Sequence, residues 1–195
     1  MIPTSIDRER AIQIISYSLV NIPSANLIVG RGKNKTNHFR SLAEYMVDVS
    51  LEKNGVYLST CRNGVILMYH SQAKVNPFKM LYYRLRLIKN CIGYLRLVSI
   101  LKREEYIQSI RSWKNNYLYV WFFGIDLGMR GKGAAYELKN VLMAESKRLN
   151  LPVFLETTLH QNKKVYQRYG FSIYHTWMSK KFKVITWFMK FSPVK

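Results

Sequence analysis

Residues 128–142, GMRGKGAAYELKNVL, combine glycines and cations at the point where a helical pattern begins. The first turn of a helix leaves backbone N–H groups unpaired and carries partial positive charge. Glycine has no side chain to keep an anion away from these groups, and Arg130 and Lys132 add positive charge. The stretch therefore predicts an anion site, most naturally for a phosphate. The alternative is an ordinary helix start preceded by a tight turn.

Two common phosphate-binding motifs do not fit this stretch. A P-loop would need glycine where Asp126 stands and serine or threonine where Gly133 stands. A dinucleotide-binding fingerprint would need glycine or alanine at Tyr136. The pattern that does fit is R-x-x-G-x-A, from Arg130 to Ala135.

The turn lies between elements of an alternating pattern of strands and helices. Residues 116–126 form an almost unbroken apolar run, which predicts a strand buried on both faces. Residues 131–149 have the periodicity of an amphipathic helix, which Asn150 and Pro152 end. The remaining elements predicted in this half are a strand at 152–159, a short helix at 161–169 and strands at 171–178 and 183–191.

The N-terminal half is predicted to be mainly helical, with helices over 6–19 and 38–55. Residues 21–37, rich in Pro, Gly and Asn, are predicted to form a loop. Residues 55–70 predict a β-hairpin, because Asn63-Gly64 stands between two apolar runs.

Residues 75–111 are long, helical and basic, with an interruption at Gly93. Such a segment suits the surface of a membrane. It equally suits two core helices with cationic outer faces, and we favour the core interpretation because a globular helix needs the same apolar stripe.

Residues 116–171 resemble the core of the GNAT superfamily of N-acetyltransferases. The first cofactor motif of that family, [Q/R]-x-x-G-x-[G/A], follows a strand and opens a helix, as Arg130–Ala135 is predicted to do. The second motif resembles NLPVFLETTLHQNKKVYQRYGF at 150–171. The resemblance implies an α/β fold with a mixed, mostly antiparallel sheet and flanking helices, in one domain over residues 1–195.

The resemblance also implies acetyl-CoA as cosubstrate, with no metal. In the family the turn binds the pyrophosphate, and a bulge splays the preceding strand from its neighbour so that pantetheine lies in the gap. Gly124 suits a bulge or a close approach to the backbone. The amides of Phe123 and Ile125 would pair with pantetheine or hold the acetyl carbonyl. The implied cofactor contacts are Phe123, Ile125, Arg130, Gly131, Lys132, Gly133, Ala134, Ala135 and Asn162.

Two side chains are candidates for catalysis. Tyr166 matches the family tyrosine that faces the sulfur, and its phenol suits a general acid; the alternative is a packing tyrosine. Glu156 lies among apolar neighbours in a predicted strand, which suits a base or a structural carboxylate paired with arginine. His160, His175 or a water relay are further candidates for the base.

The chain has 31 Lys and Arg residues against 11 Asp and Glu residues, a net charge of +20. This charge suits solvated surface or an acidic partner, and it disfavours polycationic acceptors such as polyamines. Cys61 and Cys91 give no metal-ligand spacing, and each is predicted to be buried. The start of the chain lacks the order of a signal peptide and no apolar run suits a transmembrane segment, so we expect a cytoplasmic location.

The function that these patterns favour is transfer of an acetyl group from acetyl-CoA to a primary amine, on a small molecule or a protein. One alternative is a non-catalytic CoA-binding or regulatory module. Another is a basic protein that binds nucleic acid or an anionic membrane, although no nucleic-acid motif supports it. Both a monomer and a homodimer are compatible with the sequence.

Overall fold

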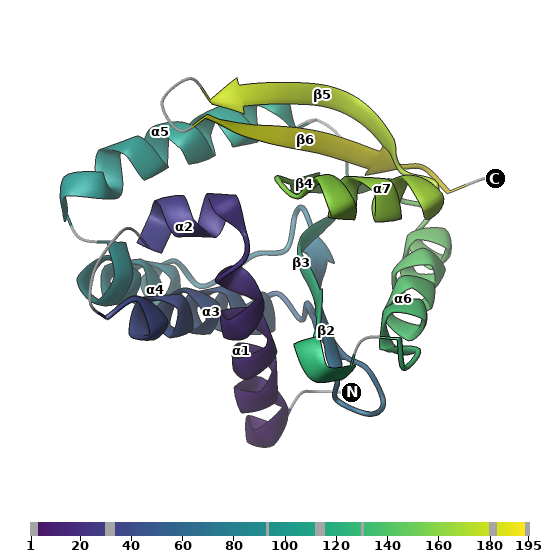
Figure 1. Cartoon of the computed structure of the whole chain (residues 1–195), viewed down its shortest axis with the longest axis horizontal. Coiled ribbons are helices and arrows are strands. Elements are labelled where there is room, and N and C mark those ends of the chain that lie inside the picture. Colours follow the sequence, from purple (N-terminus) through teal and green to yellow (C-terminus); the bar gives the residue numbers. More distant parts are fainter. Residues whose placement is uncertain are drawn as a thin grey trace.

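The computed structural model describes residues 4–29, 34–92, 94–111, 116–129, 131–179 and 183–193. Within them a six-stranded sheet, in the order β1-β2-β3-β4-β6-β5, lies between two groups of helices (Figure 1). β3 and β4 are parallel, and the other neighbouring pairs are antiparallel. The expected fold class, a mixed and mostly antiparallel sheet with flanking helices, is confirmed.

The strands agree closely with the apolar runs of the sequence. Their bounds are β1 Val56–Leu58, β2 Gly64–His70, β3 Leu118–Ile125, β4 Val153–Thr157, β5 Ser172–Ser179 and β6 Val184–Phe191.

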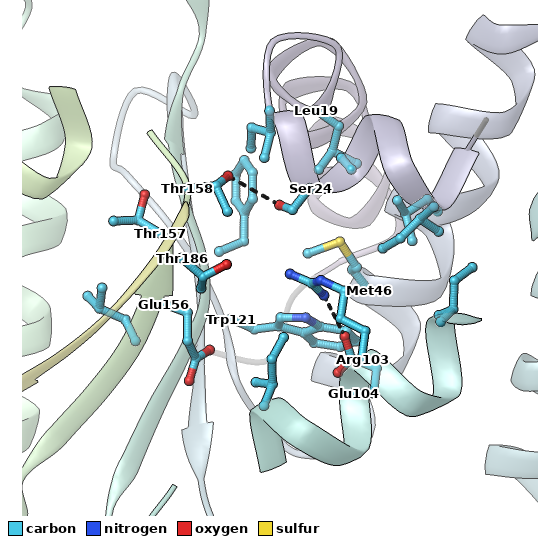
Figure 2. A pocket seen from close by; sticks show the side chains of 18 of the residues that line it. Leu19, Ser24, Met46, Arg103, Glu104, Trp121, Glu156, Thr157, Thr158 and Thr186 are labelled. Atoms are coloured by element: carbon cyan, nitrogen blue, oxygen red, sulfur yellow. Dashed lines mark hydrogen bonds and ion pairs between the residues drawn. The ribbon is translucent and has the colours of Figure 1, made fainter. Parts of the chain in front are cut away.

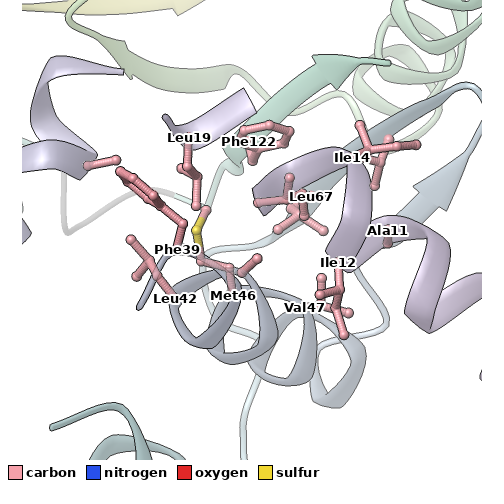
Figure 3. Close-up of a cluster of buried hydrophobic side chains, with 14 of the residues drawn as sticks. Ala11, Ile12, Ile14, Leu19, Phe39, Leu42, Met46, Val47, Leu67 and Phe122 are labelled. Carbon is pink, nitrogen blue, oxygen red and sulfur yellow. The ribbon is translucent and has the colours of Figure 1, made fainter. Parts of the chain in front are cut away.

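The first group of helices packs on one face of the sheet. It comprises α1 Ser5–Leu19, α2 Pro23–Val29, α3 Lys35–Glu52, α4 Pro77–Leu87, a π-helical stretch Ile88–Ile92 and α5 Tyr94–Ile110. The buried core on this face joins Ile12 and Ile14 of α1 to Phe39 of α3 and to Leu67 and Phe122 of the sheet (Figure 3).

The second group covers the opposite face and consists of α6 Ala134–Leu149 and α7 His160–Arg168 (Figure 1). Leu138 and Leu142 of α6 pack with Val120 of β3 and Leu155 of β4 in a second core. A short 3₁₀ turn, Leu127–Met129, joins β3 to the segment that precedes α6. Each face of the sheet therefore has its own apolar core, and β2 and β3 contribute to both.

The predicted loop at 21–37 is wrong over α2, Pro23–Val29. Pro23 stands at the start of the helix, where its fixed φ and missing N–H are tolerated. Ala25 and Val29, four residues apart, are buried in the first core. Burial of this short apolar face outweighs the local turn signals, which are only weak priors. Residues 30–33 of the predicted loop lie outside the described residues.

The predicted hairpin is confirmed, since β1 and β2 pair antiparallel. Its turn is longer than two residues, because Ser59 organises it. The Ser59 hydroxyl accepts hydrogen bonds from the N–H groups of Asn63 (3.1 Å) and Gly64 (3.0 Å). Arg62 supplies the left-handed residue, with φ 53°, and Gly64 becomes the first residue of β2.

The core interpretation of residues 75–111 is wrong for much of α4. Leu87 and Cys91 are buried, but Phe78, Leu81, Tyr82 and Leu85 point to solvent. The interruption at Gly93 lies outside the described residues.

Cys91 is buried as predicted, whereas the prediction for Cys61 is wrong because that residue is exposed in the β1–β2 turn. In the described ranges no single helix is long and apolar enough to span a membrane. α1 and α2 together meet that length and composition, but they are bent by 100° at their junction.

Candidate active site

The central feature of the sheet is the separation of β3 from β4. The two strands pair at Leu118–Val153, Tyr119–Phe154 and Val120–Leu155, and the pairing ends there. β3 continues to Ile125 and β4 to Thr157. The last part of β3 therefore has a free edge toward β4, and free strand edges present unpaired N–H and C=O groups.

A bulge in β3 coincides with this separation. Leu67 of β2 pairs with Phe122, whereas the next residue, Met68, pairs with Val120. Trp121 is therefore the extra residue, and such a residue bends the strand and increases its twist. The sequence led us to expect a bulge in this strand, but Gly124 does not form it, because Gly124 pairs regularly with Val65.

Gly124 instead accommodates a close approach. A Cβ atom at this position would lie 2.5 Å from Cε1 and 2.6 Å from Cζ of the Phe122 ring. The ring of Phe122 belongs to the first core, so the missing side chain lets that ring fold back over the strand.

The free edge of β3 offers two backbone donors. The N–H of Asp126 donates to the carbonyl of Asn63 (2.8 Å), on the β2 side of the strand. Because donor direction alternates along a strand, the N–H groups of Ile125 and Phe123 point to the other side. That side is the edge from which β4 has separated.

A cavity of about 600 Å³ opens at this separation. Its walls come from α1, α2, α3, α4 and α5 on one side of the sheet and from α7 on the other, with β3 and β4 between them. Figure 2 shows Leu19, Ser24 and Met46 on the helical side and Glu156, Thr157 and Thr158 on the strand side. Phe123, Glu156, Asn162 and Tyr166, all predicted site residues, lie together in its wall.

Tyr166 reaches the cavity from α7 and is itself 8% exposed. Its ring packs against Phe123 (6.5 Å between centroids) and Phe171 (5.7 Å). Burial raises the pKa of the Tyr166 phenol above its ordinary value, and Tyr169 adds to this shift. The hydroxyl thus stays protonated at neutral pH and has a proton to donate.

Glu156 reaches the cavity from β4 as part of a buried three-residue network. Arg111 Nε donates to Glu156 Oε1 (2.8 Å), and Arg111 Nη2 donates to Oε2 (3.0 Å). Tyr119 Oη also donates to Oε2 (2.8 Å). The side chains of Arg111 and Glu156 are only 12% and 10% exposed. Three donors already occupy both oxygens of the Glu156 carboxylate, so the geometry favours the structural alternative over the base.

The two histidines do not line the cavity. His160 begins α7 and packs its ring against Trp187 (5.9 Å between centroids). His175 lies in β5, where Nε2 is 3.2 Å from the hydroxyl of Tyr106. Asn162, in the first turn of α7, does line the cavity and there faces the separated strands.

The glycine turn lies beyond the C-terminal end of β3 and outside the cavity wall. Gly131 (φ 81°) and Gly133 (φ 84°) are both left-handed, a conformation that other residues rarely adopt. A Cβ atom at either position would meet nothing within 4 Å, so both are open to an incoming group. Arg130 lies outside the described residues.

The start of α6 has the free donors of an anion site. Gly133 is its N-cap residue, and it makes no side-chain cap. Lys132 is exposed and adjoins the glycine turn. Ala134 and Ala135 begin the helix, and their small side chains do not cover the backbone N–H groups. Uncapped N–H groups at a helix start, next to a cation, suit a phosphate.

An ion pair fixes the approach to this turn. Arg10 of α1 donates to the carboxylate of Asp126, the residue that follows β3. The same carboxylate accepts from the N–H of Gly128 (3.2 Å). These bonds tie the end of β3 to α1 and to the 3₁₀ turn that follows it.

Sequence reasoning missed the residues that reach the site from distant segments. Arg111 pairs with Glu156 across 45 positions, and Trp121 and Tyr45 form an edge-to-face pair (5.8 Å) in the cavity wall. A buried acid such as Glu156 predicts a cationic partner, but a chain with 31 Lys and Arg residues gives no means of choosing it.

Comparison with known proteins gives one family. The model described as the acetyltransferase (GNAT) family matches residues 43–171. No curated protein matches the chain.

Several solved structures share the fold. One, described as histone acetyltransferase HPA2 and related acetyltransferase, from Corynebacterium glutamicum, has a TM-score of 0.67 and 16% identity over 100% of this chain and 96% of its own. Arylalkylamine N-acetyltransferase 2 from Aedes aegypti has a TM-score of 0.66 and 14% identity, over 100% and 98%. The C-terminal condensation domain of Ebony, in complex with beta-alanyl-dopamine, has a TM-score of 0.63 and 11% identity, over 95% and 93%. At these identities the likeness concerns the fold.

Proposed function

The chain belongs to the GNAT acetyltransferase family, and from this premise we propose that it is an acetyl-CoA-dependent N-acetyltransferase. The observation that carries the proposal is the free edge of β3 beside a cavity that contains Tyr166. The acceptor is a primary amine, and it attacks the thioester directly.

The residues present fit acetyl-CoA. Left-handed Gly131 and Gly133 and the uncapped start of α6 provide exposed donors for a diphosphate. The open edge of β3 provides the N–H groups of Phe123 and Ile125 for the amide-bearing pantetheine arm. Asn162, in the cavity wall, adds a side-chain amide for the same arm. When bound, acetyl-CoA supplies an activated acyl group with a good leaving thiolate.

The chain's own groups support each step of the transfer. The neutral amine nitrogen attacks the thioester carbonyl carbon, so that a C–N bond forms and the C–S bond breaks. The N–H groups at the β3 edge are placed to stabilise the charge that develops on the carbonyl oxygen. A single donor of this kind contributes about 10²–10³-fold in rate.

Tyr166 acts as the general acid in this proposal. Its phenolic proton goes to the departing thiolate, and water later restores that proton. The nitrogen loses its own proton to water in the cavity, because the oxygens of Glu156 are already occupied by hydrogen bonds from Arg111 and Tyr119. We assign Glu156 the role of fixing β4 and α5 on either side of the cavity.

The residues of the cavity wall also indicate which kind of amine fits as the acceptor. Its described charged residues balance, with Arg84, Arg103 and Arg111 against Glu104, Glu105 and Glu156. Two of the three acids are already paired, Glu104 with Arg103 (2.9 Å) and Glu156 with Arg111 (2.8 Å). A polycationic acceptor needs several unpaired acids, and the wall instead presents Trp121 and Tyr45. These features support a compact amine with an apolar or aromatic body, such as the arylalkylamines for which one structural neighbour is named.

Release of free thiol from acetyl-CoA tests the proposal. The purified protein is incubated with acetyl-CoA and either phenylethylamine or spermidine, and the acetylated product is identified by mass spectrometry. We expect turnover with phenylethylamine and little with spermidine. Tight binding of acetyl-CoA without thiol release, over a wide panel of amines, would instead support the non-catalytic CoA-binding module.

A further inference from the structure

The outer side of α4 carries an apolar stripe that nothing in the described structure covers. Phe78 is 81% exposed, Leu81 56%, Tyr82 61% and Leu85 57%. Their spacing, i, i+3, i+4 and i+7, places them on one side of a helix. We call these four residues the outer α4 face.

The opposite side of α4 explains how the helix is held in place. Leu87 is buried in the first core. Lys79 pairs with Glu52 (2.8 Å), and Arg86 pairs with Glu44, so two ion pairs tie α4 to α3. The outer α4 face is therefore not needed to attach the helix, and large apolar side chains displayed together on a surface usually mark an interaction site.

The segment that carries this face has charged residues of one sign only, although acids of α3 pair with its Lys79 and Arg86. Residues 74–103 contain no Asp or Glu, and their cations are Lys74, Lys79, Arg84, Arg86, Lys89, Arg96, Lys102 and Arg103. Lys89 is exposed beside the end of the stripe, and Arg84 is also exposed but lines the cavity. An apolar stripe bordered by cations is the pattern of a helix that lies in a membrane interface.

The charge also indicates which kind of partner binds the outer α4 face. A second copy of the chain would bring another net charge of +20 to the same contact, which would oppose self-association. A nucleic acid would be held by cations, but it offers no partner for Leu81 and Leu85 in addition to the two aromatic rings. An anionic lipid layer suits both the apolar stripe and the cations. The apolar side chains enter the boundary of the acyl chains, and the cations contact the lipid phosphates.

We propose that the outer α4 face docks the protein on an anionic phospholipid surface. α4 lies flat on the layer, with Phe78 and Tyr82 at headgroup level and Leu81 and Leu85 directed inward. Arg84 and Leu87 of the same helix line the cavity, so docking brings the cavity close to the lipid layer.

Vesicle flotation tests the proposal with vesicles of phosphatidylcholine alone and of phosphatidylcholine mixed with phosphatidylserine. The test variant changes Phe78, Leu81, Tyr82 and Leu85 to Ser. The matched control changes Ile6 and Tyr17 to Ser, since these α1 residues are 67% and 66% exposed. We expect the wild type and the control to float with mixed vesicles, the test variant to bind them at least tenfold more weakly, and all three to bind phosphatidylcholine weakly.

Acetyl-CoA binding and circular dichroism check that the test variant is folded, and Leu85→Glu alone provides a second, milder test of the same face. Failure of the wild-type protein to bind mixed vesicles would overturn the proposal. Equal binding by wild type, the four-residue variant and Leu85→Glu would also overturn it. A wild-type dimer that the test variant converts to a monomer would assign the face to self-association. Loss of RNA binding in that variant, with vesicle binding unchanged, would assign it to nucleic acid.

Discussion

Val120 of β3 and Leu155 of β4 are the last residues paired across the parallel ladder, and the sheet opens beyond them. The last pair lies one residue before the bulge at Trp121, so the opening begins at the bulge. The cavity, the free N–H groups of β3 and the phenol of Tyr166 all lie at this opening. The chemistry that we propose depends on these two strands having separated.

Replacement of Tyr166 by Phe removes the proton that we assign to the leaving thiolate. We expect kcat to fall by about 10²–10⁴-fold, the usual contribution of a positioned acid. The dissociation constant for acetyl-CoA should change little, because the ring still packs against Phe123 and Phe171. Tyr169→Phe is the matched control, and a Tyr166→Phe enzyme with wild-type turnover would remove the acid role.

The raised pKa of Tyr166 also predicts the shape of the pH profile. Burial favours the neutral phenol, so the acid stays protonated through the pH at which an ordinary tyrosine ionises, about 10. We expect kcat to rise with pH as the amine loses its proton and then to level off. No decrease in kcat is expected at pH values below ~10. A descending limb near neutral pH in wild type, absent from Tyr166→Phe, would show that the phenol ionises much earlier.

Replacement of Glu156 by Gln should act mainly on stability. The change leaves the buried guanidinium of Arg111 without its charged partner, and breaking a buried ion pair costs roughly 3–5 kcal/mol. Denaturant unfolding of Glu156→Gln, Arg111→Met and the double variant measures the coupling between the two residues. The double variant should recover part of the loss.

The same variant distinguishes the two roles of Glu156. Under conditions where Glu156→Gln remains folded, we expect its kcat to stay within about tenfold of wild type, well below the 10²–10⁴-fold attributed to a base. A larger fall in kcat, with acetyl-CoA binding intact, would restore Glu156 as the general base.

Gly124 tests how tightly β3 is packed beside the opening. A methyl group at this position would lie within 2.6 Å of two atoms of the Phe122 ring, so that the ring must leave its place in the core. We expect Gly124→Ala to cost about 1–3 kcal/mol of unfolding free energy. Gly128→Ala is the control, because its Cβ would meet only Asp126 Oδ1, at 4.0 Å. Equal stability of the two variants in chemical denaturation would contradict the packing described for Phe122.

The sequence predicted the sheet and its long helices because their signals are local and repeated. The apolar run at 116–126 and the helical period at 131–149 needed no knowledge of partners. α2 was not predicted because its helical face consists of Ala25 and Val29 alone, and these residues are buried only by packing against α1 and α3. The outer α4 face escaped it because a stripe exposed to solvent has the same spacing as a buried one.

The site was predictable to a similar extent. Phe123, Asn162, Glu156 and Tyr166 were all expected at the site, and the fold brings them to one cavity wall. The position of the bulge was not predictable, because Trp121 is one apolar residue among many and its displacement arises from pairing with β2. Arg111 was not predictable as the partner of Glu156, since it joins that residue only through the packing of α5.

The central claim is that N–H groups of the Gly131–Ala135 turn bind the diphosphate of acetyl-CoA. Calorimetric titration of acetyl-CoA against wild type, Gly133→Gln and Gly133→Glu tests it most directly, because the two substitutions share their strain at φ 84° and differ in charge. We predict micromolar-range binding by wild type, weaker binding by Gly133→Gln and near loss in Gly133→Glu, where a carboxylate repels the phosphates. Equal affinity of all three proteins for acetyl-CoA would contradict the claim.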